Sequence, residues 1–137
     1  MTSGVLLAFD FGTQRIGVAI GDTLTRSARA LAAIPNDGKA VEAVLAEWQP
    51  GACVVGLPLN EDGSEQDITR KARAFASELE TRAKVPVHLC DERYSSRDAH
   101  ASLREARAAG TMKRRVRKGD RDSAAARLIL EQWLSEA

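Results

Sequence analysis

The sequence predicts one α/β domain over residues 1–137, in which a mixed sheet of three antiparallel strands followed by parallel strands is flanked by helices. Two apolar runs at residues 5–10 and 15–22, separated by a short Gly-Thr turn, indicate an antiparallel pair. Two later apolar runs each follow a helical segment, which indicates parallel strands joined by crossovers. The chain is long enough to bury one core, and neither a repeat nor a linker divides it.

The first part of the chain is expected to form the antiparallel strands. VLLAFD at residues 5–10 is typical of a buried strand, and RIGVAIGD at 15–22 alternates as its neighbour. Residues 24–33 are expected to form a third strand, although their many alanines disfavour it. The Asn-Asp-Gly sequence at 36–38 predicts a turn in which Asp37 caps the next helix.

Helices and strands are expected to alternate along the rest of the chain. Apolar residues at i, i+3, i+4 and i+7 from Val41 predict an amphipathic helix over 39–49, which ends at Pro50. ACVVG at 52–56 predicts a buried strand of a parallel sheet. The other expected elements are a helix at 65–83, a strand at 85–90 that ends in Asp91-Glu92, a helix at 96–109, an exposed basic loop after Gly110 and a helix at 122–135.

The composition excludes several classes of protein. Hydrophobic residues make up 44% and charged residues 28%, as in ordinary globular proteins. No apolar run reaches the roughly 18 residues that cross a bilayer, so we expect a cytoplasmic protein without a membrane partner. Cys53 and Cys90 lie in strand-like runs and are expected to be reduced core residues. With only two histidines beside them, they do not form a structural zinc site.

The net charge of +1 hides an uneven distribution. Residues 93–127 carry eleven Lys or Arg against four Asp or Glu, whereas the remainder carries nine against fifteen. A basic C-terminal third beside an acidic remainder favours a polyanion as partner over a small neutral substrate.

Three carboxylates stand where the predicted architecture would bring them together. Asp10 ends the first strand, and Glu92, beside Asp91, ends the last strand. Asp122 begins the final helix, and the residues at +3, +4, +7 and +11 from it are apolar. Asp122 therefore shares the helix face that packs on the sheet, where a carboxylate is costly unless something neutralises it.

Each carboxylate also has an ordinary structural interpretation. Asp122 could cap its helix, Asp10 could accept a backbone hydrogen bond in a turn, and the Asp91-Glu92 pair could be a solvated strand end. Their joint placement favours a cluster, because adjacent carboxylates repel one another unless a cation holds them. Oxygen ligands without histidine favour Mg²⁺ or Mn²⁺.

Such a cluster predicts phosphodiester hydrolysis, in which two divalent ions about 4 Å apart activate a water and stabilise the leaving oxygen. Arg93, beside Glu92, is a candidate to bind the scissile phosphate, the alternative being a surface ion pair. The basic loop is expected to hold the nucleic-acid backbone through Lys113, Arg114, Arg115, Arg117 and Lys118.

Four motifs, in order along the chain, carry a family resemblance: AFDFGTQRIGVAIGD, VVGLPLNEDGSEQ, DERYSS and DSAAARLILEQWL. Together they resemble the YqgF/RuvX family of bacterial ribonuclease-H-like proteins over nearly the whole chain. The resemblance implies a ribonuclease-H-like fold and a metal-dependent nuclease. That nuclease is described either as a Holliday junction resolvase in DNA recombination and repair, or as the enzyme that matures the 5′ end of pre-16S rRNA in ribosome biogenesis.

The resemblance also implies which residues bind the metal. The family's first-strand aspartate matches Asp10, its Asp-Glu-Arg glutamate matches Glu92, and the aspartate before Ala-Ala in its last helix matches Asp122. Strand parity does not choose between Asp91 and Glu92, so Glu92 is chosen from the resemblance. Where the family commonly has Leu-Thr-Thr, residues 94–96 are Tyr-Ser-Ser, which keeps the hydroxyls. The tyrosine either stacks on a base or is a partly buried aromatic.

Two other functions compete with the nuclease. Asp-Phe-Gly-Thr also opens the phosphate-binding hairpin of actin-like and sugar-kinase ATPases, but that class needs a second lobe, for which 137 residues leave no room. The other is a catalytically inert nucleic-acid-binding module, which has no need of carboxylates that repel phosphate. The sequence separates neither branched DNA from structured pre-rRNA as the partner, nor a monomer from a homodimer.

Overall fold

The computed structural model describes residues 4–60, 62–91 and 118–136, and for 118–122 it describes the backbone alone. Within these ranges the sheet has five strands in the order β3-β2-β1-β4-β5. β1 pairs antiparallel with β2 and β2 antiparallel with β3, whereas β1, β4 and β5 are parallel. The strands are β1 (Val5–Asp10), β2 (Arg15–Asp22), β3 (Ser27–Pro35), β4 (Ala52–Leu57) and β5 (Val87–Asp91). The predicted mixed α/β sheet is confirmed.

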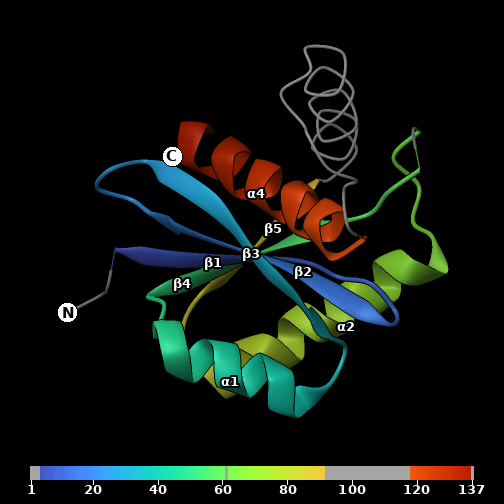
Figure 1. The fold of residues 1–137 in the computed structure, drawn as a ribbon. Helices are drawn as coiled ribbons and strands as arrows, with labels where there is room; N and C mark the ends of the chain where they lie inside the picture. Colours follow the sequence, from blue (N-terminus) through green and yellow to red (C-terminus); the bar gives the residue numbers. More distant parts are fainter. Residues whose placement is uncertain (1–3, 61, 92–117, 137) are drawn as a thin grey trace.

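Helices cover both faces of the sheet (Figure 1), and three of them lie in the part of the chain that the structure describes. They are α1 (Gly38–Trp48), α2 (Asp67–Ala83) and α4 (Lys118–Glu136). α4 lies on one face, across β1, β2, β3 and β4, while α1 and α2 cover the other face. The sheet therefore separates two apolar cores.

Alternation along β1 shows which side chains enter each core. Leu6 and Ala8 pack beneath α4 with Ile129 and Leu130 of that helix. Leu7 and Phe9 pack in the other core, with residues of α1 and α2. Gly21 of β2 lets α4 come close, because a Cβ there would lie 2.8 Å from Leu130 Cδ2.

Capping residues define where α1 and α2 begin. Asp37 caps α1, as predicted, and accepts hydrogen bonds from the backbone N–H groups of Lys39 and Ala40. Gln66 caps α2 in a reciprocal arrangement with Thr69, whose buried hydroxyl also donates to the carbonyl of Pro58. The residue that follows α1, Gln49, adopts the left-handed conformation and caps the C-terminus of the helix.

Several predicted boundaries were wrong. The third strand begins at residue 27 rather than 24, because residues 23–26 form a tight turn with Arg26 at a φ of 56°. The last strand begins after Pro86, which has no N–H for a ladder, and includes Asp91. The last helix begins at Lys118 rather than Asp122, since apolar spacing marks only the turns that pack on the sheet. The helix predicted at 96–109 lies outside the described residues.

Both cysteines are free and buried, as predicted. Burial raises the pKa of the Cys53 thiol from 9.0 to about 12, so it stays protonated at neutral pH and is not a nucleophile. Cys53 belongs to the core beneath α1 and α2, whereas Cys90 belongs to the core beneath α4. In the described part of the chain, no helix is long and apolar enough to cross a membrane.

Candidate active site

Asp10 is the last residue of β1 and pairs with Gly17 of β2. Because Leu6 and Ala8 enter the core beneath α4, strand alternation directs Asp10 to the same face. Asp10 is half-buried there, at the point where the apolar part of that core ends. The strand thus presents a carboxylate to α4 at the edge of the sheet where the parallel strands terminate.

The turn that follows Asp10 is held from several directions. A Cβ on Gly12 would collide with the backbone oxygen of Arg15, so the turn needs glycine there. The ring of Phe11 contacts Phe75 of α2, with ring centroids 5.3 Å apart. Asn36 donates from its side chain to the carbonyl of Gly12 at 2.8 Å.

A buried hydroxyl, that of Ser123, joins the N-terminal part of α4 to β2 near Asp10. Ser123 is only 1% exposed, and its Oγ accepts a hydrogen bond from the N–H of Val18 at 3.5 Å. The β2–β3 ladder has a bulge between Ile16 and Val18, where regular pairing is interrupted. Gly17 of β2 pairs with Asp10, and Val18 is the next residue of β2. Ser123, which bonds to Val18, therefore lies one strand position from the partner of Asp10. Asp122 directly precedes it in α4.

Asp91 ends β5 at the same edge of the sheet but on the other face. It pairs with Leu57 of β4. By strand alternation it shares a face with Val87 and Leu89, on the side of the sheet that α2 covers. β4 lies between β1 and β5, so the two strand ends are about 10 Å apart at normal strand spacing. Strand parity therefore directs the side chain of Asp91 to the opposite face of the sheet from that of Asp10.

The structure describes only some of the other predicted site residues, and for these only the backbone. Glu92, Arg93, Lys113, Arg114, Arg115 and Arg117 lie outside the described residues. Lys118 belongs to α4 rather than to a loop, and for Lys118 and Asp122 the backbone alone is described. Among the side chains that are described, no three from His, Cys, Asp or Glu converge to hold a metal. The three-carboxylate cluster stays a prediction.

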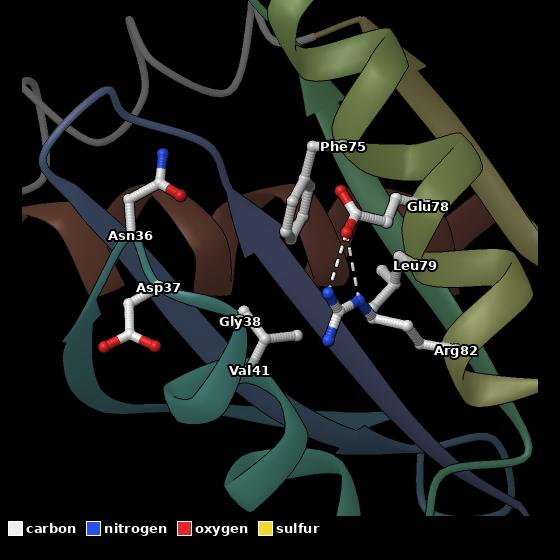
Figure 2. Close-up of a pocket in the computed structure, with 8 residues that line it drawn as sticks. All are labelled: Asn36, Asp37, Gly38, Val41, Phe75, Glu78, Leu79 and Arg82. Atoms are coloured by element: carbon white, nitrogen blue, oxygen red, sulfur yellow. Dashed lines mark hydrogen bonds and ion pairs between the residues drawn. The ribbon is translucent and has the colours of Figure 1, made fainter.

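A separate small pocket lies on the opposite face, between α1 and α2 (Figure 2). It has a volume of about 100 Å³, and Val41, Phe75 and Leu79 form its apolar side. Arg82 at its rim is paired with Glu78 and with Glu42, and the hydrogen bonds to Glu78 raise the pKa of its guanidinium further. The Arg82 guanidinium is thus already paired with two carboxylates. Asn36 and Phe75, which contact the turn after Asp10, also line this pocket.

Sequence reasoning missed two residues that shape the Asp10 edge. Asn36 was interpreted only as part of a turn, and no local pattern reveals a bond to a residue 24 positions away. Ser123 had a readable signal, because it lies three and seven residues before the buried Ala126 and Leu130. A hydroxyl on that stripe must find a partner.

The chain matches known proteins over almost its whole length. The model of the RuvX family, described as Holliday junction resolvase, matches residues 4–136. A protein of Burkholderia multivorans described as "Putative pre-16S rRNA nuclease" is 51% identical over 136 residues, covering 96% of this chain and 89% of that protein. A protein of Burkholderia vietnamiensis with the same description is 50% identical over 135 residues, covering 95% and 88%.

Solved structures show the same fold at low identity. RuvC of Thermus thermophilus, in complex with a Holliday junction substrate, aligns with a TM-score of 0.57 and 17% identity over 96% of this chain and 94% of that one. The yeast mitochondrial Holliday junction resolvase Ydc2 aligns with a TM-score of 0.51 and 11% identity, over 97% and 78%. The ribonuclease-H-like fold expected from the motifs is confirmed. By its sequence match from residue 4 to residue 136, the chain belongs to the RuvX (YqgF) family.

Proposed function

We propose that this chain is a divalent-metal-dependent endonuclease that hydrolyses phosphodiester bonds in structured nucleic acid, with the 5′ end of pre-16S rRNA as its first substrate. Membership of a nuclease family supports the hydrolase activity. Relatives at 50–51% identity, matched over almost their full length, carry the pre-16S rRNA description, which favours this substrate. Such processing takes place in the bacterial cytoplasm, where we place the protein.

The placement of Asp10 carries the proposal. Its carboxylate ends β1 on the α4 face, and Ser123 fixes the start of α4 beside that strand end. The ligands we propose are Asp10, Glu92 and Asp122. All three are carboxylates, and the described cysteines are committed to the cores, so the donor set fits a hard ion such as Mg²⁺ or Mn²⁺. When bound, the ion supplies an activated water and stabilises the leaving oxygen.

The basic residues of the chain supply the remaining functions. Arg93, next to Glu92 in the sequence, is proposed to bind the scissile phosphate. The basic residues between 113 and 118 are proposed to hold neighbouring phosphates, which fixes the strand in register without reading its sequence. The proposed hydrolysis leaves a 5′-phosphate on one product strand and a 3′-hydroxyl on the other.

Holliday junction resolution is the second candidate, and one observation favours it. The chain has the fold of RuvC over almost the full length of both proteins, and that RuvC structure contains a Holliday junction. Symmetric cleavage of a four-way junction requires two active sites and therefore a homodimer, whereas trimming one RNA strand requires a single site.

A direct comparison of the two substrates tests the proposal. Purified protein is incubated with a pre-16S rRNA 5′ fragment and with a four-way DNA junction, under Mg²⁺ and under Mn²⁺, and its mass in solution is measured. We expect metal-dependent cleavage of the RNA. Paired nicks in the junction by a dimeric protein would favour resolution instead. Binding of both substrates without cleavage of either, under both ions, would contradict the nuclease and leave a binding module.

Neutralising the basic stretch is expected to weaken binding and flatten its salt dependence. Each lysine or arginine that contacts a phosphate contributes roughly one unit to the slope of log affinity against log salt. The measurement is affinity across a salt series for a variant with glutamine at Lys113, Arg114, Arg115, Arg117 and Lys118. A matched control neutralises exposed lysines on the α1 and α2 side, at Lys39, Lys71 and Lys84. An unchanged slope in the first variant would rule out this stretch as the contact.

A further inference from the structure

The turn between β1 and β2 lies outside the strand ladder, yet it determines how the chain leaves Asp10. The ladder that involves Asp10 ends at its pairing with Gly17. Residues 13–15 are exposed, so apolar packing does not hold them. Glycine at position 12 adds backbone freedom that must be restrained from outside the turn. Strand alternation sets the face on which Asp10 lies, and the contacts of this turn with the rest of the molecule hold the chain where it leaves that strand end.

One residue supplies three hydrogen bonds to this turn. The side-chain amide of Asn36 donates to the carbonyl of Gly12 at 2.8 Å and approaches that of Thr13 at 3.4 Å. The backbone N–H of Asn36 donates to the carbonyl of Gln14 at 2.9 Å. Three successive carbonyls of the turn are thus fixed by a residue from a different part of the chain.

Asn36 is itself rigidly placed. It directly follows Pro35, which pairs with Arg15 at the end of the β2–β3 ladder. It directly precedes Asp37, the cap of α1. Figure 2 shows the Asn36 amide and the Asp37 carboxylate pointing in opposite directions, so the two neighbouring side chains serve different partners. A strand end and a helix start hold the amide against the turn.

We propose that Asn36 is a positioning residue for Asp10. Its hydrogen bonds restrain the turn at residues 12–14, and through the turn they restrain the end of β1, where strand alternation has already set the face of Asp10. This inference rests on the proposed metal site. Groups that orient a metal ligand without touching the metal change its affinity by about 10- to 100-fold, and Asn36 acts through two backbone residues. We expect an effect near the lower end, about 10-fold.

Metal affinity measured separately from activity tests this inference. Asn36→Ala removes the donor, and Asn36→Asp keeps the shape but replaces the amide with an acceptor. Mn²⁺ binding is measured by titration calorimetry, together with the Mn²⁺ concentration for half-maximal cleavage and the KM for nucleic acid. Both variants are expected to weaken Mn²⁺ binding about 10-fold and to shift the cleavage dependence by the same factor. The KM for nucleic acid is expected to stay unchanged.

Asp37→Ala is the matched control. It removes the cap of α1, next to Asn36 in the chain, but Asp37 has no hydrogen bond to the turn in the described contacts. It should lower thermal stability while leaving Mn²⁺ affinity unchanged. If Asp37→Ala weakens Mn²⁺ binding as much as Asn36→Ala, general destabilisation explains both and the inference is overturned.

Comparison with Asp10→Asn distinguishes failure of the positioning role of Asn36 from failure of the proposed metal site. If Asp10→Asn loses Mn²⁺ binding while Asn36→Ala and Asn36→Asp bind it like the wild type, the positioning role is overturned and the metal site survives. If Asp10→Asn itself binds Mn²⁺ normally, the proposed metal site is overturned and the inference with it. Circular dichroism of each variant confirms that the compared proteins are folded.

Discussion

Asp10→Asn is expected to abolish cleavage while nucleic-acid binding persists. Asparagine keeps the size of the side chain but removes the charge that holds a divalent ion. Because changes that only orient a ligand already cost about 10- to 100-fold, loss of a ligand should lower the single-turnover cleavage rate by at least about 100-fold. Binding should remain, because the basic residues are unchanged. The measurements are single-turnover cleavage with Mn²⁺ and a gel shift under the same conditions.

Asp22→Asn is the matched control for this variant. Asp22 ends β2, pairs with Val5, and therefore lies at the opposite edge of the sheet from Asp10. Its side chain accepts a hydrogen bond from the N–H of Leu24, which asparagine can also accept. Cleavage by Asp22→Asn should equal that of the wild type. Normal turnover by Asp10→Asn would remove Asp10 from the mechanism.

Phe9→Ala is expected to cause the largest loss of stability. Phe9 is fully buried beneath α1 and α2, where its ring meets Phe75 edge-on at 5.7 Å between centroids. Truncating a buried phenylalanine removes its transfer free energy and leaves a cavity, which together cost about 3–5 kcal/mol. That is a large share of the roughly 5–15 kcal/mol by which a domain is stable. Urea unfolding followed by circular dichroism measures the difference.

Leu24→Ala provides the comparison for Phe9→Ala. Leu24 is 90% exposed in the turn between β2 and β3, so its truncation should change the unfolding free energy by no more than about 0.5 kcal/mol. A loss below about 1 kcal/mol in Phe9→Ala would show that the core beneath α1 and α2 is not packed as the structure describes.

Local pattern was enough to predict the elements that support the Asp10 edge. The run that ends at Asp10 and the alternating run after it formed the predicted antiparallel pair. The cap at Asp37 also agreed with prediction, because capping depends on nearby backbone alone. The start of β3 was missed, because it depends on the left-handed conformation of Arg26, which no apolar pattern encodes.

Longer-range features of the candidate site needed three-dimensional structure. The bond from Asn36 to Gly12 joins two turns that only folding brings together. The face of the sheet on which Asp91 lies follows from its pairing with Leu57. Strand parity read from the sequence alone did not show which of Asp91 and Glu92 faces the side of Asp10. The assignment of Glu92 and Asp122 as ligands stays a prediction.

The division of the two thiols between opposite faces of the sheet has a consequence for oxidation. A disulfide requires Cβ atoms about 4 Å apart and directed toward each other, whereas Cys53 of β4 and Cys90 of β5 lie on opposite faces of two hydrogen-bonded strands. An intramolecular crosslink can therefore form only after the strands have come apart. Molecules carrying that crosslink on a non-reducing gel would be trapped in a misfolded state.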